Sequence, residues 1–428
     1  MERYIDILKN CGADAWEAVQ TRTKGWEFYF IGHKLDQNRA KNVEHITLKV
    51  YKLSEDRKSL GFASAKVAPT ESEDSLKKTA ADLVYQAGLV KNKPYKLNTP
   101  KPFEPLKAEL KPLEEEAAAF IRTMNSISET DTEYLNSFEI FTNQVERRLV
   151  NSEGVDVTEV YPTSMLDVVV NARKDDHEIE LYRLYHAGSC DPAKIRHDIE
   201  ELLQYGKDRL ITGPTPHLGK VPAVFSTDAA LRIYGYFLEN LNAAYLVRGV
   251  SSFGIGKPIA PEISGDKITL ESVRVLPGSP ENFACDAEGA PIRDAVLIRD
   301  SVPQKFIGSR MFSQYLGLED SFAVSNWKVS GGTMSADEIR SGEFLEIVEF
   351  SDFQVDSMTG DIFGEIRLAY YHDRMGNVTP VSGGSVSGSM LDNIGCMRMS
   401  KETRIYSNAE IPAVTRLENI TVAGVAGS

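Results

Sequence analysis

The segment from Lys220 to Lys257 constrains the fold of this chain more than any other part of the sequence. It begins with a short apolar run, Val221 to Phe225, that is typical of a buried strand. After a turn, Thr227 or Asp228 is placed to cap the free N–H groups of a helix. Apolar residues then recur at steps of three and four, so one face of this helix is expected to be buried. These residues are Leu231, Tyr234, Leu238, Leu241 and Tyr245.

The same segment leaves the helix through a glycine-rich corner at Gly249, Gly254 and Gly256. A strand, a helix and a loop in this order often hold metal ligands or a phosphate group. Here the helix has no histidine and no cysteine, and its single acidic residue is Glu239. The loop also departs from the phosphate-binding pattern GxxxxGK(S/T), because Pro258 follows the lysine. We therefore interpret the corner as a structural turn.

The composition is that of a globular protein with an acidic excess. The chain has 428 residues, which is enough for two or three domains with sizeable cores. Its net charge is −14 and its basic residues are scattered among acidic ones, which argues against direct binding to nucleic acid. The N-terminal sequence lacks the apolar region of a signal peptide, and no apolar run reaches the roughly 20 residues of a membrane helix. We expect a cytoplasmic protein that does not bind a membrane.

Cysteines and histidines are too dispersed to predict a disulfide framework or a metal site. The four cysteines are Cys11, Cys190, Cys285 and Cys396, and none of them forms a CxxC pair. Free thiols in a reducing compartment are therefore expected. None of the seven histidines pairs with another at i,i+4 or i,i+5.

Hydrophobic periodicity predicts an α+β protein. We assign residues 1–90 to an N-terminal α+β unit, 91–112 to a proline-rich linker, 113–213 to a middle α+β unit and 214–428 to a mainly β C-terminal domain. The first two units each read as helix, antiparallel strands, helix, and the third as largely antiparallel β with one prominent buried helix. The expected helices are 2–20, 72–87, one from 113 and one from 191. The expected strands are 26–31, 45–51, 60–67, 134–142, 147–151, 156–161, 165–172, 179–186, 268–275, 344–353, 363–371 and 419–425.

Two acidic residues, Asp356 and Asp361, flank a glycine turn in the C-terminal domain. A pair of carboxylates could bind a cation or act as acid and base. Carboxylates beside a turn more often accept hydrogen bonds from its backbone, and that structural interpretation is the preferred one.

Short motifs spread along the chain carry a family resemblance. The C-terminal domain holds KVPAVFST (220–227), SSFGIGK (251–257), CDAEG (285–289), GSR (308–310), YLG (315–317), NW (326–327), VDSMTGD (355–361) and ITVAG (420–424). The middle unit adds NSEG at 151–154. In order and spacing these motifs resemble the TldD/PmbA family, and specifically its PmbA branch, also called TldE. Members have been called modulators of DNA gyrase, and the family is related to metallopeptidases.

The resemblance implies a peptidase system with two kinds of subunit. In the TldD type, zinc is held by an HExxxH motif on the helix equivalent to 229–247 and by a cysteine near the C-terminus, and it activates water to attack a peptide carbonyl. The motif positions in this chain fall near Tyr236, Phe237 and Leu241, whose side chains cannot ligate zinc in that role.

The late cysteine position falls near Glu410 and Ile411, and Cys396 lies upstream of it. The resemblance therefore predicts a chain with no catalytic residue and no cofactor of its own. Such a chain would pair with a TldD-type zinc subunit and help to bind peptide substrates for proteolysis or peptide maturation. The family motifs also mark possible peptide-binding or structural positions, which are Phe253, Asn326, Trp327, Asp356 and Asp361.

Two other functions fit the same residues. The chain could be a peptidase in its own right that uses acidic residues such as Asp356, Asp361 or Glu239, and purified protein would then contain stoichiometric metal. It could instead be a homodimer that regulates a target by binding, without proteolysis. The fold alone does not decide among these functions.

Overall fold

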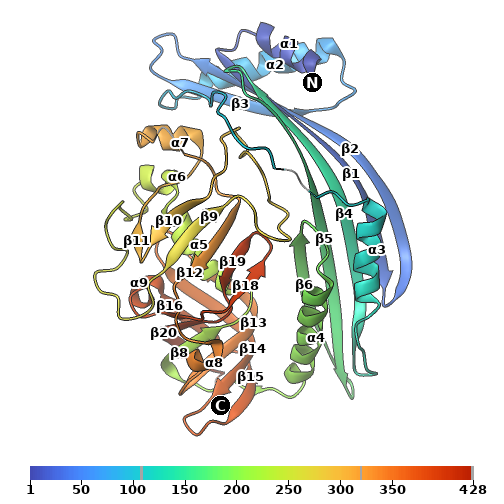
Figure 1. The fold of residues 1–428 in the computed structure, drawn as a ribbon, viewed down its shortest axis with the longest axis vertical. Coiled ribbons are helices and arrows are strands. Elements are labelled where there is room, and N and C mark those ends of the chain that lie inside the picture. The colour runs from blue at the N-terminus through green and yellow to red at the C-terminus, as the bar shows by residue number, and fades with distance from the viewer. Residues whose placement is uncertain (107–108, 319–320, 426–428) are drawn as a thin grey trace.

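The computed structural model describes residues 1–106, 109–318 and 321–425 and confirms the predicted α+β class. The described strands pair mostly antiparallel, in sheets of six, six and eight strands. Figure 1 shows how the helices lie around these sheets. The helices are α1 (Glu2–Asn10), α2 (Glu73–Leu89), α3 (Leu113–Met124), α4 (Pro192–Arg209), α5 (Ala230–Asn240), α6 (Ala243–Val247), α7 (Arg310–Tyr315), α8 (Ala336–Ile339) and α9 (Met390–Asn393).

The four longest strands, of 17 to 20 residues, all lie in the N-terminal half. In chain order they are β1 (Ala15–Ile31), β2 (Lys34–Leu53), β3 (Leu60–Val67), β4 (Glu133–Asn151), β5 (Asp156–Lys174), β6 (His177–Ala187), β7 (Gly213–Pro214), β8 (Gly219–Phe225), β9 (Thr269–Val273), β10 (Ala295–Arg299), β11 (Val302–Pro303), β12 (Asn326–Ser330), β13 (Phe344–Val355), β14 (Asp361–His372), β15 (Val378–Ser382), β16 (Ser385–Ser389), β17 (Arg398–Met399), β18 (Thr403–Tyr406), β19 (Ala409–Pro412) and β20 (Thr415–Ala423).

The first sheet is built from both N-terminal units, in the order β3-β2-β1-β4-β5-β6. β1 pairs antiparallel with β4 from Glu17 opposite Asn151 to Ile31 opposite Ser137. The two predicted units therefore join edge to edge into one continuous sheet. Helices α1 and α2 pack near its β1–β3 end, and α3 and α4 pack on β4 and β5.

Two helix starts follow from local sequence, as predicted. The side chain of Ser72 accepts a hydrogen bond from a backbone N–H in the first turn of α2. The carboxylate of Asp191 accepts hydrogen bonds from the N–H groups of Ala193 (3.1 Å) and Lys194 (3.0 Å), and Pro192 occupies the first helical position. In both cases the capping group satisfies donors that a helix leaves free, so the helix begins where the sequence predicts.

Other predicted bounds are wrong, because tertiary pairing overrides the local pattern. The helix expected over 2–20 ends at Asn10, since Gly12 adopts a φ of +83° and the chain then enters β1. The strands expected at 134–142 and 147–151 form the single strand β4, and those at 156–161 and 165–172 form β5. β4 continues through its centre because it pairs with β1 there, where Gly25 allows a close approach. A Cβ at Gly25 would lie 2.4 Å from Oδ1 of Asn143.

The predicted linker contains no named helix or strand among its described residues, 91–106 and 109–112. It is nevertheless attached to both halves of the molecule. Nδ2 of Asn151 in β4 donates to the carbonyl oxygen of Asn98 at 2.8 Å, and Nδ2 of Asn98 donates to that of Glu288 at 3.0 Å. Leu97 beside it is buried. The described part of this segment is thus an extended connection that is hydrogen-bonded to both the first sheet and the C-terminal domain.

Helix α4 packs between the first sheet and the eight-stranded sheet of the C-terminal half. Ile199 and Leu202 of α4 share one buried cluster with Val168 of β5, Val348 of β13 and Leu368 of β14. The middle unit and the C-terminal domain therefore have a common hydrophobic core. No helix in the described residues combines the length and the apolar character needed to cross a membrane.

The central helix differs from the prediction at both ends. α5 begins at Ala230 without a side-chain cap, and its first N–H groups bond to backbone carbonyls, including those of Thr227 and Asp228. The predicted capping by either side chain is therefore wrong. The helix ends at Asn240, and Asn242 starts the separate helix α6 by accepting a hydrogen bond from the N–H of Ala244 at 3.0 Å. The single long helix expected over 229–247 is thus two short ones.

Candidate functional site

Three side chains stand where the family motif would place zinc ligands, and all three lie in the core of the C-terminal domain: two on helix α5 and one directly after its end. Tyr236, Phe237 and Leu241 are 6%, 0% and 0% exposed. The predicted buried face is correct only in part, because Tyr234 and Leu241 are buried, whereas Leu231, Leu238 and Tyr245 are only half-buried. α5 packs against β19, and all three side chains share a core cluster with Ile411 of that strand. The helix and the strand on which the family motif places ligands therefore meet, through apolar contacts.

These side chains do not fit a zinc ion. Burial raises the pKa of Tyr236, so its phenol stays protonated at neutral pH. Phe237 and Leu241 have no donor atom, and Glu410 of β19 pairs with Lys328 at 2.6 Å. Within the described ranges, no three histidine, cysteine, aspartate or glutamate side chains are grouped so that they could hold a metal. That this chain functions without its own zinc stays a prediction.

The core also contains two of the positions suggested for peptide binding, Phe253 and Trp327, which are 8% and 7% exposed. The rings of Phe253 and Tyr236 meet edge to face, with centroids 6.3 Å apart. Phe253 therefore packs against the central helix, and Trp327 of β12 lies in the same cluster. Both have internal packing roles, and a part in peptide binding stays a prediction for each.

Asn326, the neighbour of Trp327, is fully buried in a network of hydrogen bonds. Its Oδ1 accepts from the hydroxyl of Ser279, and its Nδ2 donates to the carbonyl oxygen of Glu281 and to Oδ1 of Asn282, both at 3.0 Å. These partners belong to the loop that follows β9. Asn326 therefore holds that loop against β12.

The two acidic residues Asp356 and Asp361 lie on the exposed turn between β13 and β14. The carboxylate of Asp356 accepts from the N–H groups of Met358 (2.7 Å) and Thr359 (2.9 Å), which keeps its pKa below the usual range. The carboxylate of Asp361 accepts from the Thr359 hydroxyl at 2.8 Å. Asn240 at the end of α5 donates to a carbonyl oxygen of this turn at 2.9 Å. Both carboxylates therefore accept hydrogen bonds from residues of the turn, as the structural interpretation predicts.

A cavity of about 660 Å³ lies between the middle unit and the C-terminal domain. Its walls come from β6, the start of α4, the residues before α5, and β18. Figure 1 shows β6 and α4 beside β18. β6 and β18 are the terminal strands of their two sheets. Each therefore has one backbone edge that no neighbouring strand of its own sheet uses.

An arginine from the β6 wall reaches the C-terminal domain across this cavity. Arg183 binds Oε1 of Glu349 in β13 at 2.7 Å and Oδ1 of Asp228 at 3.3 Å. The Glu349 side chain is 16% exposed and that of Asp228 is 51% exposed. Burial raises the pKa of Glu349, and the charge of Arg183 opposes that change.

A second arginine crosses the cavity in the opposite direction. Arg404 of β18 binds Oδ1 of Asp198 at 2.7 Å and Oε2 of Glu201 at 3.1 Å, both on α4. Its guanidinium also lies 5.5 Å from the ring centroid of Tyr406. The two walls are thus joined by ion pairs in both directions: the middle unit supplies the arginine of one pair, and the C-terminal domain supplies the arginine of the other.

The cavity also contains a thiol, Cys190, which is not suited to nucleophilic catalysis. Burial raises its pKa to about 11, so the thiol is protonated at neutral pH. Its backbone N–H bonds to the carboxylate of Glu116, which ties the start of α4 to α3. The chemistry that this cavity offers is binding through charged and aromatic side chains.

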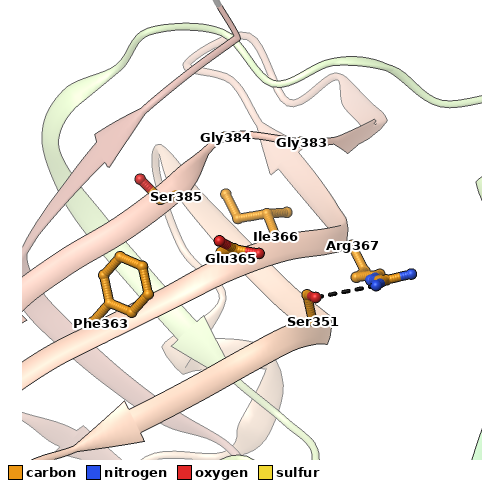
Figure 2. A pocket seen from close by; sticks show the side chains of 8 residues that line it. All are labelled: Ser351, Phe363, Glu365, Ile366, Arg367, Gly383, Gly384 and Ser385. Atoms are coloured by element: carbon orange, nitrogen blue, oxygen red, sulfur yellow. Dashed lines mark hydrogen bonds between the residues drawn. The ribbon is translucent and has the colours of Figure 1, made fainter.

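A second pocket, of about 480 Å³, lies beside β14 and the turn between β15 and β16. Figure 2 shows Phe363 and Glu365 along β14, with the Arg367 guanidinium donating to the hydroxyl of Ser351 at 3.1 Å. Among the residues that line it are none of the positions predicted from the sequence. With one acidic and one basic side chain, it has no catalytic pair of carboxylates, and we assign it no function.

Sequence reasoning missed the residues of the larger cavity. Arg183 and Glu349 are far apart in the chain, as are Arg404 and Asp198, and no local pattern connects them. Of the cavity residues, Asp228 was the one that the sequence marked, as a possible cap of α5, and it pairs instead with Arg183.

Comparisons with known proteins identify the family. The family model for the PmbA/TldA metallopeptidase C-terminal domain matches residues 218–424, and that for the central domain matches residues 107–195. No curated protein matches the chain in sequence.

Solved structures support the same assignment at the level of the fold. TldE from Thermococcus kodakarensis superposes with a TM-score of 0.78 at 17% identity, covering 99% of this chain and 100% of that one. A Thermotoga maritima protein, named for modulation of a DNA gyrase, gives 0.77 at 15% identity and 99% coverage of both chains. A similarly named Bacteroides thetaiotaomicron protein gives 0.77 at 15%, covering 99% of this chain and 98% of that one. The chain therefore belongs to the PmbA/TldD family of metallopeptidase-related proteins and has the TldE fold.

Proposed function

We propose that this chain is a non-catalytic subunit that pairs with a TldD-type zinc metallopeptidase and helps to bind its peptide substrates. The zinc would reside in the partner subunit, and this chain would need no cofactor. The pair would act in the cytoplasm, on peptides that are degraded or matured.

The observation that carries this proposal is that apolar and aromatic side chains occupy the zinc-motif positions on and directly after helix α5. Tyr236, Phe237 and Leu241 stand where the family motif would supply zinc ligands, and they form part of a continuous core. Introducing ligands there would require polar groups in a region that is closed to water, which is costly unless a metal compensates. A scaffold that is preserved around such a core suits a supporting subunit better than an enzyme.

The cavity between β6 and β18 supports the peptide-binding part of the proposal. Its volume of about 660 Å³ lies within the range of about 300–1,000 Å³ that is common for ligand sites. Extended peptides bind to strand edges through main-chain hydrogen bonds, and two terminal strands border this cavity. The main chain of a peptide would therefore bind here through hydrogen bonds that do not involve its side chains.

The test compares three preparations: this chain alone, a TldD-type subunit from the same organism, and an equimolar mixture of both. Each is incubated with an unstructured peptide, and the fragments are measured by mass spectrometry. We expect cleavage by the mixture, its loss with a chelator, and no cleavage by this chain alone. Chelator-sensitive cleavage by this chain alone would overturn the proposal.

Metal content and mass separate the remaining alternatives. We expect zinc analysis to find metal in the TldD-type subunit and less than one-tenth of that amount in this chain. Light scattering should give the mass of a heterodimer for the mixture. A homodimer that does not exchange with the TldD-type subunit would instead favour a regulatory binding protein.

A further inference from the structure

We infer that the cavity between β6 and β18 selects a peptide segment that carries a lysine or arginine side chain. This inference rests on the proposed peptide-binding function and adds to it the charge of the preferred ligand. It follows from the balance of charges in the walls, the exposure of two carboxylates, and the aromatic groups beside them.

The walls hold more carboxylates than basic groups. The carboxylates are Asp191, Asp198, Glu201 and Asp228, with Glu349 behind Arg183. The lysine and arginine side chains are Arg183, Lys194 and Arg404, and the imidazole of His186 also lines the cavity. Each of these three basic side chains already contacts a carboxylate of the walls. An acidic ligand would have to compete for them, whereas a basic ligand would meet the surplus of negative charge.

Two of these carboxylates remain open to a ligand. In each arginine pair, one carboxylate is buried and close, and the other is more exposed and more distant. Asp228 is 51% exposed at 3.3 Å from Arg183, and Glu201 is 30% exposed at 3.1 Å from Arg404. A lysine or arginine of a peptide can therefore approach either carboxylate while the wall arginine keeps its buried partner.

Aromatic side chains complete the environment of a cation. Nζ of Lys194 lies 5.5 Å from the ring centroid of Tyr185 and 5.7 Å from that of Tyr406, so this region already accommodates a positive charge. Tyr185 and Tyr406 both line the cavity, so a ligand ammonium or guanidinium can contact their rings in the same way.

The test uses three decapeptides that differ only in one central residue: lysine, glutamine or glutamate. Binding is measured by fluorescence anisotropy, for the full-length chain and for its mixture with the TldD-type subunit. We expect the lysine peptide to bind about three- to tenfold more tightly than the glutamine peptide, and the glutamate peptide to bind most weakly. Higher salt should reduce the difference.

Two variants locate the effect. Asp228→Asn and Glu201→Gln each leave one carboxylate on the wall arginine, since Glu349 and Asp198 remain. We expect each variant to lower the preference for lysine while binding of the glutamine peptide changes less. Glu55→Gln, on the exposed turn between β2 and β3, removes the same charge elsewhere and is the matched control.

The outcomes distinguish this inference from the proposed function. Equal binding of all three peptides, or a preference that both variants leave unchanged, would overturn the charge selection and leave the peptide-binding subunit standing. Binding of none of the peptides by either preparation would contradict both. Thermal unfolding of each variant confirms that a loss of preference is not a loss of fold.

Discussion

Replacing Asn326 by alanine should destabilise the C-terminal domain strongly, because it breaks a buried network rather than a surface contact. Asn326 is fully buried, and its removal leaves the hydroxyl donor of Ser279, which is 3% exposed, without an acceptor, while the carbonyl oxygen of Glu281 keeps only the N–H of Phe283. The unpaired donor costs about 1–3 kcal/mol, and each of the two hydrogen bonds lost to Glu281 and Asn282 costs about 0.5–1.5 kcal/mol, so the expected loss is about 2–6 kcal/mol.

The assay is urea unfolding followed by tryptophan fluorescence, since Trp327 is adjacent. Asn38→Ala, at an exposed position of β2, is the matched control and should change the free energy of unfolding by less than about 0.5 kcal/mol. Ser279→Ala and the double variant complete a cycle, in which we expect a coupling of about 1–2 kcal/mol. A loss below about 1 kcal/mol for Asn326→Ala would refute the reasoning, since the network would then not support the loop.

Two further predictions concern the C-terminal domain. Phe237→Ala should cost about 3–5 kcal/mol in urea unfolding, because the side chain is fully buried, whereas Phe363→Ala at a 46% exposed position should cost less than 1 kcal/mol; similar losses would contradict the assigned core. Burial against Phe344 lowers the pKa of His372 below 6.5. The imidazole of His372 therefore binds a proton more readily in the unfolded chain than in the folded one. The stability that the neutral imidazole contributes is complete above pH 6.5 and is lost as the pH falls through the pKa of the folded state. His372→Gln should reduce the loss of stability between pH 7.5 and 5.5, and an unchanged pH dependence would contradict this assignment.

The parts of the fold that were predictable from the sequence are those that depend on nearby residues. Ser72 and Asp191 cap helices through hydrogen bonds to residues in the next turn, so the helix starts were found. The break between the strands expected at 147–151 and 156–161 is also local, because Asn151 Oδ1 accepts from the N–H groups of Glu153 and Val155, both at 3.0 Å. Local chemistry fixes each of these features.

Features that depend on distant pairing were not predictable in the same way. The centre of β4 has the polar residues Asn143, Gln144 and Glu146, which interrupt the apolar pattern, yet it continues as a strand because β1 pairs with it. The cavity arises from contacts such as that of Arg404 with Asp198, which no motif marks. The resemblance assigns the zinc-motif positions to the region of α5, since it rests on the order of motifs rather than on any contact, and the role of these positions stays a prediction.

Helix α4 connects the two walls of the cavity and fixes their relative position. Its apolar side chains are held by both sheets, while Asp198 and Glu201 on the same helix contact Arg404 of β18. Widening the cavity would therefore expose a hydrophobic core as well as separate ion pairs. We therefore expect a polypeptide to enter along the length of the cavity, without separation of its two walls.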